Sequence, residues 1–142
     1  MSDQPAPRET SPLAEALISV GDRWTLLVVE ALLEGPRRFN DLLAEIAGIA
    51  PNILTQRLRH LEGQRLIVAQ PYSERPPRSL YELTASGREL AGALRLLSDW
   101  GARHTEGEAP RHRACGSPLE ARWFCPTCGE AVDEGEEDLH FV

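Results

Sequence analysis

Hydrophobic residues recur at helical spacing over much of the first hundred residues, and this pattern predicts a mainly helical domain. A first short helix is expected from Pro12, because Ser11 can cap it and proline suits the first helical position. Residues 24–33 are apolar on most faces, which predicts a buried central helix with Trp24 in the core. A third helix is expected over residues 39–46, with its apolar side chains facing inward.

The segment 51–63 predicts an amphipathic helix with an uncommon polar face. Its inner face is a narrow stripe of leucines at positions i, i+4 and i+7: Leu54, Leu58 and Leu61. Its outer face carries amides and a guanidinium where a solvated helix usually has Glu and Lys: Asn52, Gln56 and Arg59, with Gly63 at the end. Asn, Gln and Arg are the side chains that make bidentate contacts with base edges in the major groove. The helix alone is equally consistent with a DNA-reading helix and with an ordinary amphipathic surface helix, so the rest of the chain must distinguish them.

A short turn over residues 47–50, which contains a glycine, joins the helix 39–46 to the helix 51–63. Two short helices joined in this way are typical of a helix-turn-helix. In that arrangement the second helix enters the groove of the DNA.

The hydrophobic period changes to that of strands after Gly63, and residues 66–70 and 79–83 predict two strands. The polar link 71–78 contains three prolines. Two arginines lie in this link, Arg75 and Arg78, so the hairpin is expected to form a wing with an arginine-bearing tip. A purely structural hairpin with solvated arginines is the alternative.

A long helix is expected from Thr84, its N-cap, to about His104. Its apolar side chains follow a helical stripe: Leu90, Leu94, Leu97 and Trp100. Leu96 makes this helix more apolar than a one-sided surface helix needs, which predicts packing against a second subunit. The alternative is that the helix covers only its own domain.

The formal charge of −7 is unevenly distributed along the 142 residues. Residues 51–80 contain five Arg and two Glu, whereas residues 106–142 contain three Arg and nine Asp or Glu. The acidity therefore lies mainly in the tail, and the locally basic middle of the chain suits a nucleic acid. Residues 1–10 predict a disordered arm without the pattern of a signal sequence, and no apolar run reaches the roughly 18 residues of a membrane span. A cytoplasmic protein is expected, in which the three cysteines do not form structural disulfides.

Four sequence blocks, in this order, resemble the HxlR-type winged helix-turn-helix transcriptional regulators: residues 21–28, 35–42, 49–58 and 76–87. The resemblance covers about residues 11–104 and implies a mainly helical α+β fold with a two-stranded wing. It also implies a small homodimeric bacterial protein, related in architecture to MarR-type regulators, that binds double-stranded DNA. In such a dimer the N-terminal helix and the helix 84–104 form the subunit interface, and two recognition helices reach successive major grooves.

One position departs from the family pattern. Members commonly carry a cysteine before the proline of the first helix, and here Ser11 stands before Pro12. A hydroxyl cannot follow the oxidation chemistry of a thiol, so no redox switch is expected at this site.

Residue chemistry and the resemblance together suggest candidate DNA contacts. Contacts with base edges are expected from four residues of the helix 51–63: Asn52, Thr55, Gln56 and Arg59. Arg57 is expected to contact phosphate or the neighbouring helix. Arg75 and Arg78 of the wing are expected to contact the DNA backbone or the minor groove. Arg37 and Arg38, at the start of the helix-turn-helix, are expected to hold flanking phosphates. Repression is the expected mode of action, because a dimer bound at a promoter blocks polymerase without further machinery. The effector is unknown, and a pocket lined by Trp24 and Trp100 is a hypothesis.

The tail over residues 105–142, outside the resemblance, contains two pairs of metal-ligand residues. The pairs are His112-x-x-Cys115 and Cys125-x-x-Cys128, the second followed by a glycine. Together they supply a Cys₃His tetrahedral set, which is typical of one structural Zn²⁺ per chain in a zinc-ribbon-like β module. Residues 119–124 alternate like a strand between the pairs. A segment of this size has too little hydrophobic core to fold alone, and a bound metal would stabilise it.

Alternatives for the tail are a Cys125–Cys128 dithiol acting as a redox switch, and a degenerate ribbon without metal. His104 or His140 could take the place of His112, and the acidic run 134–138 is expected to be solvated. An enzyme is not expected, because four protein ligands leave no open metal position and no nucleophile–base pair or Gly-rich phosphate loop is found. A winged-helix and ribbon module that binds proteins instead of DNA is the alternative function.

Overall fold

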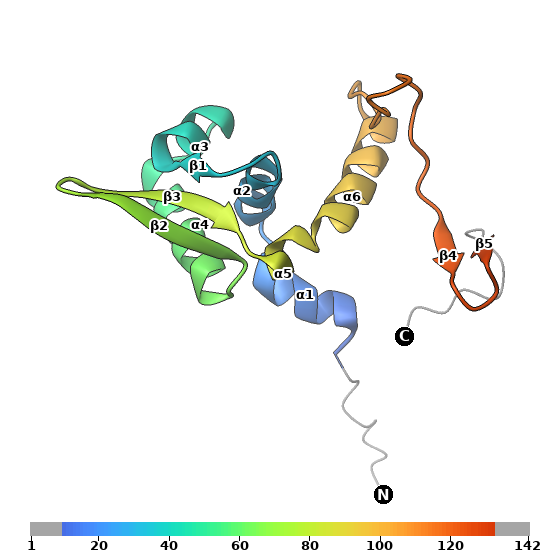
Figure 1. Cartoon of the computed structure of the whole chain (residues 1–142), viewed down its shortest axis with the longest axis horizontal. Helices are drawn as coiled ribbons and strands as arrows, with labels where there is room; N and C mark the ends of the chain where they lie inside the picture. Colours follow the sequence, from blue (N-terminus) through green and yellow to red (C-terminus); the bar gives the residue numbers. More distant parts are fainter. Residues whose placement is uncertain (1–9, 133–142) are drawn as a thin grey trace, which may run out of the picture. The chain divides into compact units, whose positions relative to one another are not determined.

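The computed structural model describes residues 10–132, which form helices and strands in the order drawn in Figure 1. The elements are α1 (Pro12–Val20), α2 (Arg23–Leu33), β1 (Arg37–Arg38), α3 (Phe39–Glu45), α4 (Pro51–Gly63), β2 (Ile67–Glu74), β3 (Pro77–Leu83), α5 (Ala85–Arg88), α6 (Ala91–His104), β4 (Trp123–Cys125) and β5 (Glu130–Val132). Contacts group the chain into two compact units, Met1–Leu94 and Arg95–Val142. Among the described helices, none has the length and apolar character needed to span a bilayer.

The predictions for the two ends of the chain fall largely outside the described residues. They concern the arm 1–10, of which only Thr10 is described, the acidic run 134–138 and His140. The expected boundary between the two domains lay after His104, whereas the contacts divide the chain within α6.

Local sequence signals set the two ends of α1. The hydroxyl of Ser11 accepts a hydrogen bond from the backbone N–H of Ala14 at 3.1 Å, and Pro12 occupies the first helical position, as predicted. Gly21 ends the helix by donating its N–H to the carbonyl of Leu17 at 2.8 Å. A Cβ at this position would collide with that carbonyl, so the close turn requires glycine.

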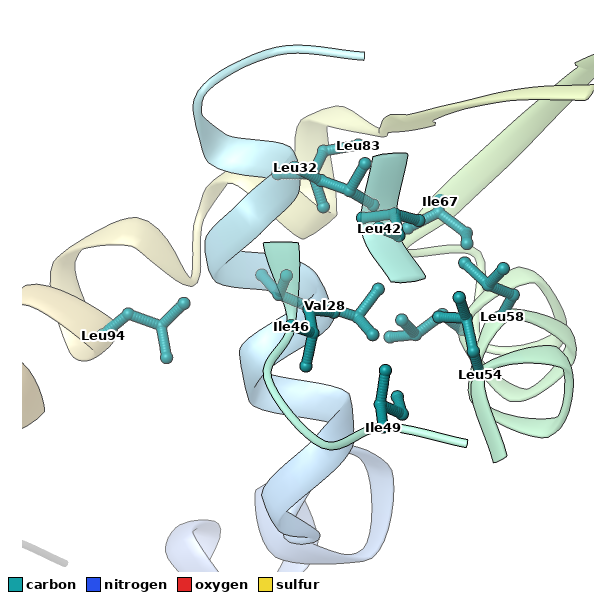
Figure 2. Packing of buried hydrophobic residues seen from close by; sticks show 12 residues of the cluster. Val28, Leu32, Leu42, Ile46, Ile49, Leu54, Leu58, Ile67, Leu83 and Leu94 are labelled. Atoms are coloured by element: carbon teal, nitrogen blue, oxygen red, sulfur yellow. The ribbon is translucent and has the colours of Figure 1, made fainter. Parts of the chain in front are cut away.

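The core of the first unit lies between α2, α3 and α4 (Figure 2). Its buried hydrophobic residues come from these helices and from the elements that follow: Val28, Val29, Leu32, Leu42, Ile46, Ile49, Leu54, Leu58, Leu61, Ile67, Leu83 and Leu94. The prediction of a buried central helix over residues 24–33 is confirmed, although Trp24 is only half-buried against the core. This shared cluster holds the helices of the helix-turn-helix against one another.

Helix α4 spans the predicted residues 51–63 and presents the two predicted faces. The inner leucines are at most 2% exposed: Leu54, Leu58 and Leu61. The outer polar residues are exposed: Asn52, Gln56 and Arg59. The turn before the helix contains Gly48 with φ +80°, a left-handed conformation that glycine adopts without steric cost.

The wing contains longer strands than the pattern predicted. Strands β2 and β3 pair along their lengths, so only residues 75–76 form the tip, and the predicted polar link 71–78 is mostly strand. Three prolines led to the shorter prediction, and the two within strands are tolerated, because Pro71 lies in the edge strand β2 and Pro77 is the first residue of β3. In Figure 1 this hairpin projects beyond α3 and α4.

A third strand, β1, adds to the wing and was not predicted. Its two residues pair antiparallel with β3, Arg37 with Tyr81 and Arg38 with Leu80, which gives the strand order β1-β3-β2. Two residues are too few to show the alternation by which a strand is recognised in a sequence. This strand anchors the start of α3 to the wing.

The prediction of one helix over residues 84–104 is wrong, because the chain forms α5 and α6 with a break at residues 89–90. Thr84 caps α5 as predicted, its hydroxyl accepting a hydrogen bond from the N–H of Gly87 at 3.1 Å. Gly87 is buried, and a Cβ there would collide with the carbonyl of Leu66. The close approach of this segment to the Leu66 carbonyl therefore requires glycine at position 87.

The second unit contains a short antiparallel hairpin formed by β4 and β5. The strand expected over residues 119–124 begins only at Trp123. The aromatic side chains of this segment stay in contact with water, since Trp123 is 45% and Phe124 63% exposed. Strands of three residues offer too little apolar surface to bury them.

Candidate nucleic-acid interface

The outer face of α4 presents polar side chains that are not tied to other described residues by hydrogen bonds or ion pairs. Asn52, Gln56 and Arg59 are exposed and form no hydrogen bond or ion pair within residues 10–132. Thr55 differs, because it is half-buried and its hydroxyl donates to the carbonyl of Pro51 at 3.0 Å. Three of the four residues predicted to contact bases are therefore available to a groove, and Thr55 is bonded to its own helix.

Arg57 connects α4 to the start of α2. Its Nη1 lies 3.3 Å from Oδ2 of Asp22. Asp22 also caps α2, because its Oδ1 accepts the N–H groups of Trp24 at 2.9 Å and Thr25 at 3.0 Å, and its Oδ2 accepts the Thr25 hydroxyl. Nε of Arg57 is buried without a hydrogen-bond partner among the described residues, so this guanidinium is held within the domain. Of the two roles expected for Arg57, the structure contains the contact with a neighbouring helix.

The hydrogen bonds and the ion pair of Asp22 lower the pKa of its carboxyl group. Burial raises the pKa, but the hydrogen bonds from Thr25, the Arg57 charge and the Trp24 N–H outweigh it and hold the pKa below its ordinary value of 3.8. A carboxyl group whose pKa is lowered by folding stabilises the fold fully above its unfolded-state pKa. That contribution is lost as the pH falls through the lower folded-state value.

We expect Asp22→Ala to lower the free energy of unfolding by about 0.5–2 kcal/mol at neutral pH, because it removes the cap of α2. The difference from wild type should shrink as the pH falls below 3.8. Urea denaturation at neutral and acidic pH measures both effects, with Glu30→Ala, an exposed acid of the same helix, as the control. A stability loss that does not change with pH would contradict a role for the charge of Asp22.

Helix α1 contacts the C-terminal end of α4 through polar groups that the sequence pattern did not indicate. Nε2 of His60 lies 2.6 Å from the carbonyl oxygen of Ser19, and the Ser19 hydroxyl donates to Oε1 of Gln64 at 3.0 Å. These partners are 41 and 45 positions apart in the chain, so residue spacing could not reveal them. They join α1 to the helix that carries the candidate DNA-reading face.

A polar hollow of about 510 Å³ lies where the start of α3 meets the wing. Its lining includes residues from both elements: Arg38, Asn40, Tyr72, Arg78 and Ser79. The guanidinium of Arg38 lies 5.0 Å from the ring centroid of Tyr72, a cation–π contact that positions this side chain. Arg38 and Arg78 are both exposed, and neither forms an ion pair within the described chain. The fold thus brings two predicted phosphate contacts to one site, together with Tyr72, which the sequence reasoning missed.

The other two arginines predicted to contact the DNA backbone differ in availability. Arg75 is exposed at the tip of the wing. Nε of Arg37 instead pairs with Oε1 of Glu45 at 2.8 Å, and its Nη1 donates to the carbonyls of Gly35 at 3.2 Å and Pro36 at 3.1 Å. Arg37 therefore fastens the chain between α2 and α3, which makes it a weaker candidate for a phosphate contact.

The predicted zinc ligands form two pairs in the second unit. Nδ1 of His112 lies 3.3 Å from Sγ of Cys115, and the thiol of Cys125 is hydrogen-bonded with Cys128. Over residues 10–132, no three His, Cys, Asp or Glu side chains gather in an arrangement that could hold a metal. A bound zinc therefore stays a prediction, and so does the dithiol switch.

Hydrogen bonds lower the thiol pKa in each pair. The hydroxyl and N–H of Ser117, together with His112, lower the pKa of Cys115 to about 7. Hydrogen bonds from Cys128 and from the N–H of Thr127 lower the pKa of Cys125. These bonds favour the thiolate, which is the metal-binding and nucleophilic form of cysteine.

The two tryptophans expected to line an effector pocket belong to different units. The guanidinium of Arg23 lies 4.2 Å from the ring centroid of Trp24. Trp100 stacks on His104 with the centroids 4.4 Å apart, and Nδ1 of His104 lies 2.7 Å from the Trp100 carbonyl oxygen. His104 is thus engaged within α6, and the effector pocket stays a prediction.

Residues 19–109 match the HxlR-like helix-turn-helix family. An uncharacterized HTH-type transcriptional regulator of Mycobacterium tuberculosis is 38% identical over 129 residues, a match that covers 87% of this chain and 81% of that protein. The solved structure of a Pseudomonas aeruginosa protein described as a transcription factor is 35% identical, with a TM-score of 0.66 and 85% of each chain covered. A structure from Porphyromonas gingivalis, described as a transcriptional regulator of the MarR family, is 26% identical with a TM-score of 0.65, and the match covers 72% of this chain and 100% of that one.

These similarities extend over most of the chain. Because 87% of 142 residues is about 124, the match to the Mycobacterium tuberculosis protein continues past residue 109, where the family match ends. The predicted winged helix-turn-helix and its likeness to MarR-family structures are confirmed. The chain therefore belongs to the HxlR-like helix-turn-helix family of transcriptional regulators.

Proposed function

We propose that the protein is a homodimer that binds a specific sequence of double-stranded DNA and acts as a repressor. The observation that carries this proposal is the outer face of α4, where Asn52, Gln56 and Arg59 are exposed and unengaged among the described residues. The buried leucines on the opposite face hold this helix firmly in the domain. A helix held in this way can place amide and guanidinium groups against adenine and guanine edges in the major groove.

The polar hollow between α3 and the wing supports the same orientation on DNA. Arg38 and Arg78 line it, and Arg75 lies at the end of the hairpin. In the sequence, one of these exposed arginines precedes α4 and two follow it. Contacts of this kind with phosphate set the register of a protein on the duplex without reading its sequence. They also make affinity strongly dependent on salt, because each one releases a condensed counterion.

Two helices expose apolar side chains that a monomer would leave in water. The residues are Leu13, Leu17 and Ile18 of α1, and Leu96, Leu97 and Trp100 of α6, each between 41% and 72% exposed. A second subunit would cover such surfaces. A two-fold dimer would then present two copies of α4 to the two half-sites of a palindromic operator. Occupation of a promoter by this dimer would exclude polymerase, which is the basis for proposing repression.

The experiment begins with selection of a preferred duplex from random sequences, followed by fluorescence anisotropy over a series of salt concentrations. We expect Arg78→Ala to weaken binding to selected and unrelated duplexes alike, since a phosphate contact carries no sequence information. The slope of log affinity against log salt should fall by about 1 for each subunit that loses the contact. Arg88→Ala is the matched control, because the guanidinium of Arg88 already pairs with Glu82 at 3.1 Å.

Two outcomes would contradict the proposed function. The first is a selection that enriches no duplex. The second is an affinity of the wild-type protein that does not depend on salt. Either result would favour a winged-helix module that binds proteins.

A further inference from the structure

Two turns in the second unit share one backbone design. Each consists of six residues, 112–117 and 125–130, whose flanking residues are bridged, and in the second turn Cys125 also pairs with Glu130. The bridged residues are Arg111 with Pro118 and Phe124 with Ala131. The fifth residue of each turn is a glycine with φ +72°, Gly116 and Gly129, a conformation that other residues adopt only with strain.

The hydrogen bonds inside the two turns also correspond. The N–H of Gly116 donates to the carbonyl of His112 at 2.7 Å, and the N–H of Gly129 donates to the carbonyl of Cys125 at 2.8 Å. Both bonds join the first and fifth residues of the turn. This backbone conformation brings together the side chains of the first and fourth residues of each turn: His112 with Cys115, and Cys125 with Cys128.

We propose that these two turns bind one structural Zn²⁺ through His112, Cys115, Cys125 and Cys128. Each turn supplies two donors, and together they complete the tetrahedral Cys₃His set that zinc favours. Thiolate and imidazole ligands select zinc over Mg²⁺ and Ca²⁺, which prefer oxygen. Four protein ligands leave no position for a water molecule or substrate, so this site holds structure and carries no catalysis.

A shared metal explains how a segment with so little core is stabilised. Strands β4 and β5 have three residues each, and the two aromatic side chains of β4, Trp123 and Phe124, are exposed. An isolated hairpin of this kind is marginally stable in water. The two ligand pairs are not gathered into one cluster within residues 10–132, so binding of the ion would bring the turns together and order the segment between them.

The test uses the full chain purified under reducing conditions. We expect about one zinc per chain by mass spectrometry of the metal, as a Cys₃His set binds a single ion. After exchange of zinc for Co²⁺, the visible absorption of tetrahedral cobalt with thiolate ligands should appear, a result that needs no variant. Cys128→Ser and His112→Gln should lose the metal. His104→Gln should retain it, because His104 is bonded and stacked within α6.

Limited proteolysis provides a second test of whether zinc holds the two turns together. Trypsin should cut slowly after Arg113 and Arg122 in the zinc-loaded protein and rapidly after chelation, as judged from the masses of the fragments. DNA binding is measured on the same variants, so that failure of the zinc proposal is distinguished from failure of the proposed function.

Three results would overturn the zinc proposal. One is a reduced wild-type chain that contains no metal and takes up neither Zn²⁺ nor Co²⁺. Another is a Cys125–Cys128 disulfide that forms reversibly in a protein unable to bind zinc. The third is loss of the metal in His104→Gln with retention in His112→Gln, which would exclude this ligand set.

Discussion

Arg59→Ala should weaken binding to the selected operator by about 1–3 kcal/mol, roughly 5- to 150-fold, with much less effect on unrelated DNA. The reason is that Arg59 lies exposed on the outer face of α4 and forms no hydrogen bond or ion pair with another described residue. Its guanidinium is therefore free to make two hydrogen bonds with a guanine edge. Anisotropy titrations with operator and scrambled duplexes, at one salt concentration, measure the difference.

The matched control for Arg59 is Arg95→Ala, which removes the same charge from an exposed position of α6. It should leave the ratio of operator to scrambled affinity unchanged. The unfolding transition of Arg59→Ala should match that of wild type, since the side chain is outside the core. Unchanged operator affinity in Arg59→Ala would show that α4 does not read bases in the proposed way.

Leu97→Glu should separate the subunits and reduce operator affinity by about 10²- to 10⁴-fold, because one subunit can occupy only one half-site. Leu97 is 54% exposed on α6, beside two further exposed apolar residues of that helix, Leu96 and Trp100. A carboxylate placed in a buried subunit interface would have to be desolvated without a partner. Sedimentation velocity measures the association state, and anisotropy on the same samples measures the affinity.

Ser98→Glu introduces the same charge at the next, exposed position of α6 and should leave both the dimer and its affinity nearly unchanged. A monomeric wild-type protein would refute the proposed dimer directly. A dimeric Leu97→Glu variant with full operator affinity would place the subunit interface elsewhere.

Long periodic segments could be predicted from the sequence because their buried faces repeat at a fixed spacing. The helix 51–63 was predicted with its bounds, its buried leucines and its polar face, and the structure confirms each of these. The caps at Ser11 and Thr84 were also predicted, since a cap depends on residues only three positions apart. Short or locally constrained elements were missed. The two-residue strand β1 has no detectable period, and the apolar stripe of residues 90–100 does not reveal the break between α5 and α6.

The residue types of the candidate DNA-binding site could be predicted from the sequence, but not which of its arginines are left without an acidic partner in the described part of the fold. Helical spacing separates Arg59, on the outer face of the helix 51–63, from Arg57, but it does not show which acidic partners the arginines have. The fold pairs Arg57 with Asp22 and Arg37 with Glu45, and it leaves Arg59 exposed and unpaired within the described chain. Such pairing depends on which helix lies beside which, and no local pattern contains that information.

Hydrophobic period, caps and turn residues allowed the helices, the wing and the polar face of α4 to be predicted, because each depends on residues a few positions apart. The family was predicted from four sequence blocks that resemble it, and the match over residues 19–109 confirms it. The two ligand pairs of the tail were also found in the sequence, because their spacing is local. The structure was needed to show which arginines are paired, how Arg38 and Arg78 meet beside Tyr72, and that the two tail turns share one backbone design. The first two features depend on contacts between residues distant in the chain, which form when the core of the first unit packs. The third is a property of backbone dihedral angles within each turn, which residue spacing does not specify.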